Sequence, residues 1–244
     1  GYSGILVLCE MRNGSPDRST YELLGEARKL SAGTKEVSVL VITDNAYDAA
    51  EKLIHAGADR VIKAVHKDLE YFSTEPYTSI LTKVILTDKP EIVLAAATTT
   101  GRDVMPRVSK SLDTGLTADC TELKIDPDSG MLMQTRPAFG GNIMATIKTP
   151  DHRPQMSTVR PRSTPVPPRE EGRTGELIEI TVPTELLAGK EERLGFRPME
   201  NDDMNIEDAD MIVAGGRGIK KSENMALVHD LAKRFDAAVG ASRD

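Results

Sequence analysis

The amino-acid sequence predicts an α/β protein: a three-layer domain built on a parallel sheet, with an added antiparallel hairpin region, followed by the first part of a second α/β domain. In the first hundred residues, short apolar runs alternate with segments of helical periodicity, which is typical of a parallel sheet covered on both faces. A turn-rich stretch with shorter strands follows and indicates antiparallel pairing. The strand–helix pattern then returns at about residue 210.

Four apolar runs predict buried strands, at 4–10, 37–42, 60–65 and 91–97. Short runs rich in Ile, Leu and Val, bounded by polar loops, are typical of parallel strands buried on both faces. Lys63 interrupts the third run, so we expect that strand near an edge of the sheet.

The segments between these strands have the 3.6-residue apolar spacing of helices packed on a sheet. Gly33 and Gly57 stand where a left-handed cap would end the first two helices. The predicted helical segments are 20–33, 46–57, 76–90 and 98–112.

The pattern changes after residue 120. Residues 121–137, "TELKIDPDSGMLMQTRP", read as a strand, a Pro-Asp-Ser-Gly turn and a second strand. Further strands are predicted at 142–149, 156–161 and 176–182, and the proline-rich, charged residues 161–175 predict a loop or extended arm. We therefore expect an N-terminal domain over 1–182, a linker over the acidic residues 183–204, and an incomplete second domain over 205–244.

Composition narrows the class of protein. A net charge of -7 argues against a nucleic-acid binder, and no apolar run approaches the roughly 20 residues that membrane insertion needs. Cys9 and Cys120 lie far apart without metal-type spacing, which favours reduced thiols in a cytosol-like compartment. No secretory leader precedes the first strand, and a removed organellar transit peptide stays an alternative.

The first candidate site is the stretch "AAATTTGRD" at 95–103, where a buried strand ends in three threonines and a glycine and a helix begins. Hydroxyls and amides at such a position suit an anion or a partner. The alternative is that the threonines cap the helix and Asp103 complements its dipole. The second candidate is "RPAFGGNIMA" at 136–145, where adjacent glycines after Phe139 allow close backbone approach, with a simple wide turn as the alternative.

The third candidate is the glycine-rich turn "VAGGRGIKKSEN" at 213–224. Lys220 and Lys221 stand where a P-loop and a dinucleotide fingerprint, respectively, would have glycine. The backbone at Gly216 and Gly218 still allows amides to approach a phosphate, and Arg217 adds a forked cationic donor. A tight turn without ligand is the alternative.

The fourth candidate is "VGASRD" at 239–244, where Ser242 and Arg243 follow a short strand and would reach the same crevice. Taken alone, Arg243 would be read as a surface arginine. The four histidines are scattered, without a nucleophile or metal-ligand spacing beside them, so we expect no catalytic residues and no metal site.

Together these stretches resemble the α subunit of electron transfer flavoprotein. The resemblance begins with "ILVLCEMRNG" and "TYELLGEARKLS" and continues through "ATTTGRDVMPRVSKSLDTGLTADCTEL", "QTRPAFGGNIMATI" and "PQMSTVRP" to "ADMIVAGGRGIKKSEN" and "AAVGASRD". It covers practically the whole chain in the same order, and the block with "TGLTADC" is highly specific in combination.

The resemblance implies a nucleotide-binding-like N-terminal domain that docks a β subunit, with the loops at 98–103 and 136–142 facing that partner. It also implies an FAD-binding second domain, with Gly216, Arg217 and Gly218 near the FAD phosphates and Ser242 and Arg243 near the isoalloxazine. Such a protein has no metabolite substrate of its own and passes electrons from a flavin dehydrogenase, of the acyl-CoA dehydrogenase type, to an acceptor. Simple transfer and bifurcation with NAD and ferredoxin both stay open. The expected location is the bacterial or archaeal cytoplasm, with the mitochondrial matrix as the alternative.

The sequence departs from the family in one respect. The glutamine-, glycine- and threonine-rich loop and the isoleucine-glutamine-histidine segment that follow "VGASR" in the family are absent. These carry much of the FAD contact, so we expect a C-terminally truncated chain that binds FAD weakly or not at all.

The rival interpretation is an adenine-nucleotide-binding or hydrolysing α/β protein without a redox role. It requires a phosphate loop rich in serine and glycine after the first strand. "EMRNGSPDRS" supplies Gly14 and Ser15, but its proline and charges make it a poor phosphate cradle.

Overall fold

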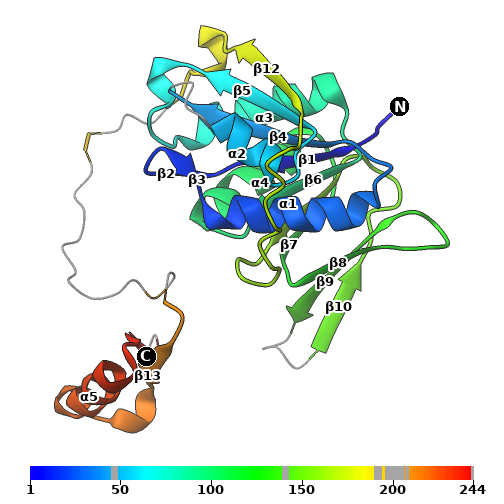
Figure 1. Ribbon diagram of the computed structural model, residues 1–244. Helices are drawn as coiled ribbons and strands as arrows, with labels where there is room; N and C mark the ends of the chain where they lie inside the picture. Colours follow the sequence, from blue (N-terminus) through cyan, green and yellow to red (C-terminus); the bar gives the residue numbers. More distant parts are fainter. Residues whose placement is uncertain (45–48, 139–142, 190–193, 196–205, 207–208, 243–244) are drawn as a thin grey trace. The chain divides into compact units, whose positions relative to one another are not determined.

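The computed structural model describes residues 1–44, 49–138, 143–189, 194–195, 206 and 209–242 (Figure 1). The chain divides into two compact units, Gly1–Glu192 and Arg193–Asp244. The boundaries expected from the sequence, at 182 and 205, stay predictions.

The first unit is built on a seven-stranded sheet with the order β12-β5-β4-β1-β6-β11-β7, in which every neighbouring pair is parallel (Figure 1). The strands are β1 (Ile5–Leu8), β4 (Val37–Thr43), β5 (Arg60–Val65), β6 (Ile92–Ala96), β7 (Leu116–Cys120), β11 (Gln155–Val159) and β12 (Glu176–Thr181). The helices are α1 (Arg18–Ser31), α2 (Ala49–His55), α3 (Thr74–Asp88) and α4 (Thr99–Ser111).

Alternate residues of each central strand point into two separate hydrophobic layers. Ile5 and Val7 of β1 pack with α1 and α2, whereas Leu6 and Leu8 pack with α3 and α4. Because these strands are buried on both faces, their sequences are continuous apolar runs. The predicted three-layer arrangement is confirmed.

The predicted strand at 60–65 is the second strand from one edge of the sheet, in agreement with the expectation from Lys63. β12 pairs with it and is itself the edge strand. The positions of β11 and β7, at the other edge of the sheet, could not be predicted from the local sequence pattern. No strand was predicted at Leu116–Cys120, yet β7 forms there by pairing with β11, which lies about forty residues later in the chain. β11 itself enters the parallel sheet between β6 and β7.

The predicted hairpin is confirmed as β8 (Glu122–Ile125) and β9 (Leu132–Ala138), and β10 (Ile143–Ile147) adds a third antiparallel strand. Two buried glutamines attach this small sheet to the large one. Ser157 Oγ donates to Gln134 Oε1 at 2.6 Å, and the Leu132 amide donates to Gln155 Oε1 at 2.8 Å. A short antiparallel hairpin, whose strands β2 (Met11–Arg12) and β3 (Ser15–Pro16) have two residues each, was not predicted.

The predicted arm at 161–175 crosses α1 on its way from β11 to β12 (Figure 1). The Arg162 amide donates to Glu22 Oε2 at 2.7 Å, and Arg173 donates to Asp59 at 2.6 Å. A Cβ atom on Gly25 of α1 would lie 3.2 Å from the Pro165 carbonyl oxygen, so this glycine lets the arm pass close to the helix. The arm thereby ties the middle of the sheet to its β12 edge.

The second unit contains β13 (Ile212–Gly215), α5 (Met225–Phe235) and β14 (Ala238–Ala241), with two short 3₁₀ turns between β13 and α5. The two strands are parallel neighbours, and Val228 and Ala232 of α5 are its buried residues. The strand–turn–helix–strand order predicted from the sequence is confirmed.

Candidate functional site

Two of the predicted site residues meet at the carboxyl ends of β13 and β14. Gly215 pairs with Ala241, and the Ser242 amide donates to the Gly215 carbonyl at 3.2 Å. A Cβ atom built on Gly216 would lie 3.8 Å from Ser242 Oγ. The parallel register therefore places the glycine turn and the exposed serine side by side at the carboxyl ends of the two strands, where open α/β sheets bind their ligands.

The glycines of this turn have different roles. A Cβ atom on Gly215 would lie 2.2 Å from Ile219 Cδ1, so this glycine is required for packing beneath the turn. A Cβ atom on Gly218 would have no described atom within 4 Å, and Gly218 therefore faces open space. The sequence predicted that Gly216 and Gly218 face a ligand; a Cβ atom on Gly216 would meet only Ser242 within 4 Å, and one on Gly218 no described atom.

The backbone of the turn suits a phosphate group. The turn's own hydrogen bonds run from the Ile219 amide to the Gly216 carbonyl at 3.0 Å and from the Lys220 amide to the Arg217 carbonyl at 3.2 Å. The Gly216 and Gly218 amides come before the Ile219 and Lys220 amides that donate these bonds. At the start of a helical turn, such backbone amides remain available as donors to an anion. Arg217 and Lys220 are exposed beside them. These residues fit the diphosphate of a dinucleotide. Arg243 lies outside the described residues.

In the first unit, the predicted site at 98–103 is mainly a helix cap. Thr98 Oγ1 accepts a hydrogen bond from the Gly101 amide at 3.2 Å, and Asp103 accepts one from Thr74 Oγ1. A Cβ atom on Gly101 would lie 1.9 Å from the Ala96 carbonyl oxygen, which explains the glycine by close packing of α4 on β6. The capping alternative thus accounts for most of this motif.

Thr98 also links two strands. Its hydroxyl donates to Glu10 Oε1 at 2.5 Å, and Glu10 follows β1 whereas Thr98 follows β6. β1 and β6 are neighbours at the point where the strand order reverses. Burial raises the pKa of Glu10 to about 7, against the opposing effect of the Thr98 hydrogen bond. A cavity of about 170 Å³ beside Glu10 is lined by Thr100, Phe72 and Tyr77, among others.

The sequence did not single out Asp119, the centre of an arginine cluster at the carboxyl ends of β7 and β11. Arg160 donates to both carboxylate oxygens of Asp119, at 3.1 and 2.7 Å, and Arg102 lies 3.4 Å from one of them. The sequence signal that could have revealed this cluster is the arginine in each of "TGRD", "QTRP" and "TVRP", which are far apart in the sequence.

Of the second predicted loop, 136–142, the structure describes only 136–138, at the end of β9.

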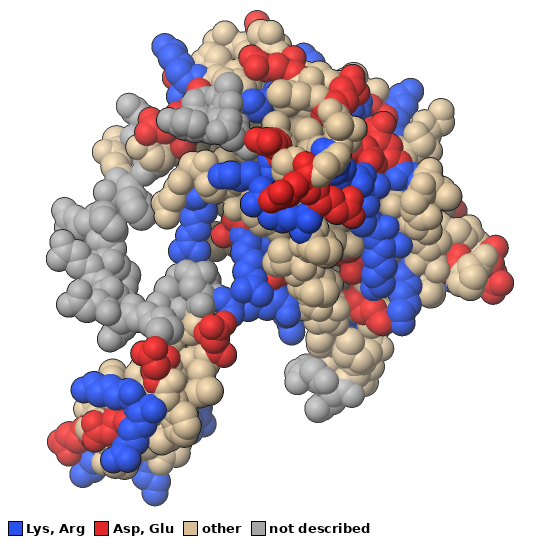
Figure 2. All heavy atoms as spheres, viewed as in Figure 1, with Lys and Arg blue, Asp and Glu red and all other residues tan. Residues whose placement is uncertain are grey.

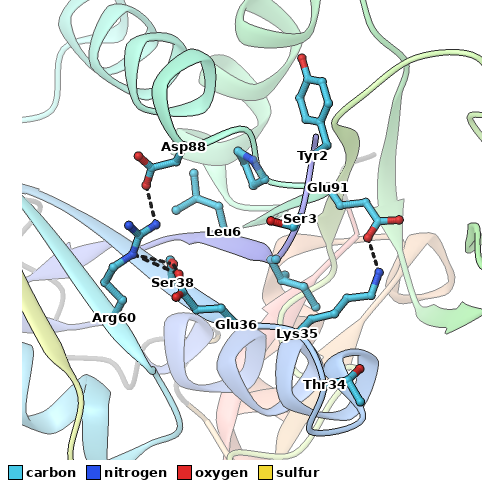
Figure 3. Close-up of a pocket in the computed structure, with 13 residues that line it drawn as sticks. Tyr2, Ser3, Leu6, Thr34, Lys35, Glu36, Ser38, Arg60, Asp88 and Glu91 are labelled. Carbon is cyan, nitrogen blue, oxygen red and sulfur yellow. Dashed lines mark hydrogen bonds and ion pairs between the residues drawn. The ribbon is translucent and has the colours of Figure 1, made fainter.

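A larger hollow, about 510 Å³, opens at the opposite, amino-terminal edge of the sheet (Figure 3). Its charged groups satisfy one another: Lys35 pairs with Glu91, and Arg60 lies 3.2 Å from Glu36 and 2.5 Å from Asp88. A charged ligand would have to break these pairs. Both signs of charge are also interspersed over the visible face of the first unit (Figure 2).

Within the described residues, no group of three or more His, Cys, Asp and Glu side chains is arranged to hold a metal ion. No helix in the described part of the chain has the length and apolar character to cross a bilayer.

Comparison with known proteins agrees with this geometry. Residues 5–185 match the family model described as electron transfer flavoprotein domain, and residues 205–244 match the electron transfer flavoprotein FAD-binding domain. The chain is 42% identical to an electron transfer flavoprotein subunit alpha from Thermoanaerobacterium thermosaccharolyticum, over 99% of this chain and 73% of the relative. Identity is 40% to the corresponding subunit from Megasphaera elsdenii and 39% to a protein FixB from Clostridium saccharobutylicum, each over 99% of this chain and 72% of the relative. The chain belongs to the electron transfer flavoprotein family, among its α subunits.

Proposed function

We propose that this chain works with a β subunit as an electron carrier whose FAD is held by the second unit. The meeting of Gly216 and Ser242 at the carboxyl ends of two parallel strands carries this proposal. The crevice lies within the region that matches the FAD-binding domain of the family. FAD supplies the redox chemistry, and the protein supplies binding, orientation and electrostatics.

We assign roles to the residues of the glycine turn and of the end of β14. The amides of Gly216 and Gly218 and the guanidinium group of Arg217 hold the phosphates. Ser242 and Arg243 lie at the flavin end, where a fixed positive charge favours a more negative, reduced flavin. These assignments rest on the family resemblance together with the described geometry of the turn.

The proposed partner of the first unit, residues 1–182, is the β subunit, with the loops at 98–103 and 136–142 as part of the docking face.

The proposed electron donor is a flavin dehydrogenase of the acyl-CoA dehydrogenase type. Bifurcation is the alternative to simple transfer, and reduction of ferredoxin by NADH in the presence of the oxidised dehydrogenase would distinguish them. The proposed location is the cytoplasm of a bacterium or archaeon, with the mitochondrial matrix as the alternative, and the bacterial sources of the similar proteins favour the former.

We further propose that the 244-residue chain by itself binds FAD weakly or not at all. The second unit as described exposes large apolar side chains on α5, with Leu227 72% and Phe235 56% exposed. One helix on two strands buries too little apolar surface to hold a crevice rigidly. Weak binding by this chain alone is therefore expected together with tight binding in the intact protein.

The test uses the intact protein reconstituted with its β subunit. Arg217→Ala is expected to weaken FAD binding by about tenfold or more, because one charge-assisted phosphate contact is lost. Arg234→Ala is the matched control, because Arg234 is an exposed arginine of the same unit on α5, away from the strand ends. Flavin fluorescence measures both affinities. A colourless complex that hydrolyses ATP would overturn the proposal in favour of the nucleotide-hydrolysing alternative.

A further inference from the structure

One residue of the glycine turn has a backbone conformation that is unfavourable for its type. Lys220 has a φ of 63° and a ψ of −38°, and the Lys221 amide donates to the Ile219 carbonyl oxygen across it at 2.7 Å. A positive φ, a negative ψ and a hydrogen bond between residues two apart define the strained form of the γ-turn. Residues other than glycine adopt it rarely and at a cost in free energy.

Lys220 differs from the residues that end the longer helices with a positive φ. Those residues are Ala32, Lys89 and Asp236, with ψ values of 30°, 55° and 45°. They lie in the left-handed helical region, which is ordinary at the end of a helix. Lys220 lies outside that region, so the ending of a helical turn does not account for its conformation.

Glycine does not stand where this backbone needs it most. Gly215, Gly216 and Gly218 all have φ values outside the range from +20° to +160°. The residue that does have a positive φ is Lys220, at the position where a P-loop would have glycine. Glycine would adopt this conformation without steric cost. Strain that is kept at a ligand-binding turn is typical of a functional residue, and the function then belongs to the lysine side chain.

The structure around Ile219 holds the strained turn in place. A Cβ atom on Gly215 would lie 2.2 Å from Ile219 Cδ1, so the Ile219 side chain packs tightly beneath the turn. Asn224 Nδ2 donates to the Ile219 carbonyl oxygen at 2.8 Å, and this oxygen also accepts the bond from the Lys221 amide. Asn224 is therefore a positioning residue, because it fixes the peptide group that precedes Lys220.

The Lys220 side chain is exposed at the edge of the glycine turn. Among the described residues, none accepts a hydrogen bond from its ammonium group or pairs with it. An ammonium group on a flexible stem binds phosphate as a compact charge with three donors. Its chemistry thus matches that of the backbone amides of Gly216 and Gly218, which suit an anion.

We propose that Lys220 is a further FAD-binding residue, whose ammonium group contacts the diphosphate and whose strained γ-turn, held by Asn224, positions that group. This inference rests on the proposed function and extends it from Arg217 and the glycine amides to a second cation. The turn then offers two cations and two backbone amides to a doubly charged diphosphate.

The test measures two properties of the intact protein reconstituted with its β subunit: the affinity for FAD at low and high salt, and the unfolding midpoint of the flavin-free protein. Lys220→Gln removes the charge and keeps the turn. We expect it to weaken FAD binding by about tenfold at low salt and by less at high salt, with an unchanged midpoint. Lys220→Arg restores a cation and should recover most of the affinity.

Lys220→Gly separates the charge from the strain. It should weaken FAD binding as much as Lys220→Gln does, yet raise the unfolding midpoint, because glycine relieves the positive φ. Lys221→Gly is the matched control, since Lys221 is an exposed lysine with an extended backbone, at φ −131° and ψ 144°. The control should change the affinity by less than about threefold and should not raise the midpoint.

Each result supports or overturns the inference. Parent affinity for FAD in both Lys220→Gly and Lys220→Gln would show that the side chain does not contact the ligand. Equal losses of affinity in Lys220→Gly and Lys221→Gly would replace a specific contact by a general effect of positive charge. A lower midpoint for Lys220→Gly would show that no strain is held at this position. A parent complex without FAD would mean that the proposed function itself has failed.

Discussion

The Thr98 hydroxyl donates a 2.5 Å hydrogen bond to the Glu10 carboxyl group and so connects the ends of β6 and β1 at the point where the strand order reverses. Because Thr98 also caps α4, one side chain fixes the helix start and a buried acidic group together. The polar groups at this point of the first unit are therefore engaged with one another, in contrast with the open space beside Gly218.

Glu10 makes the stability of the first unit depend on pH. Burial raises its pKa from the ordinary 4.5 to about 7, so between these values the folded unit keeps a proton that the unfolded chain loses. The free energy of unfolding should fall as pH rises through this window, by at most about 3 kcal/mol. Urea unfolding at pH 4.5 and 7.5 measures this. Glu10→Gln keeps an acceptor for Thr98 and should remove this part of the pH dependence. An identical pH dependence in that variant would contradict the account.

Gly101→Ala should destabilise the first unit strongly. Its added Cβ would lie 1.9 Å from the Ala96 carbonyl oxygen, and neither α4 nor β6 can move away without loss of core packing. We expect a loss of about 3 kcal/mol in the free energy of unfolding. Gly172→Ala is the control, because a Cβ there would have no described atom within 4 Å. Equal unfolding midpoints for the two variants would show that α4 is not held in this position.

Asp59 anchors the arm to the sheet edge. Partial burial alone would raise the pKa of Asp59, but pairing with Arg28 and Arg173, at 2.5 and 2.6 Å, together with the bond from the Val37 amide lowers it. A lowered pKa stabilises the fold above the ordinary value of 3.8, and this contribution is lost as pH falls. Asp59→Asn should therefore cost about 1 kcal/mol at pH 7, since the side chain is partly screened by solvent, and much less at pH 3. Chemical denaturation at pH 7 and at pH 3 measures the loss of unfolding free energy in this variant. An equal loss at the two pH values would mean that charge pairing does not cause the stabilisation.

Arg243→Ala in the intact protein should lower the one-electron reduction potential of the bound flavin. In the proposed role, Arg243 is a cation beside the flavin, and its loss removes a charge that favours the more negative form; a tenfold change in that equilibrium corresponds to about 59 mV. Redox titration of the purified complex gives the potential. Arg234→Ala, with the exposed arginine on α5, should leave it unchanged. An unaltered potential in the Arg243→Ala protein would exclude this role.

The parts of the fold that local pattern determines were predictable. β1, β4 and β6 are largely apolar runs, β5 is an apolar run that Lys63 interrupts, and the glycine turn with Ser242 lies between elements that are neighbours in both sequence and space. β7 was missed because its five residues alternate only weakly and are stabilised by β11, far away in the sequence. The cluster around Asp119 was missed for the same reason: its members come from four segments that only the folded sheet brings together.

The central claim is that the turn at Gly216 and Gly218 and the end of β14 hold an FAD that carries electrons. The most direct measurement is the FAD content and affinity of the intact protein reconstituted with its β subunit, beside the Gly216→Val variant, whose side chain would fill the space next to Ser242. We predict one FAD held by this crevice in the parent complex and its loss in the variant, with the association of the subunits retained. Wild-type FAD content and affinity in the Gly216→Val protein, or a parent complex without flavin, would contradict the account.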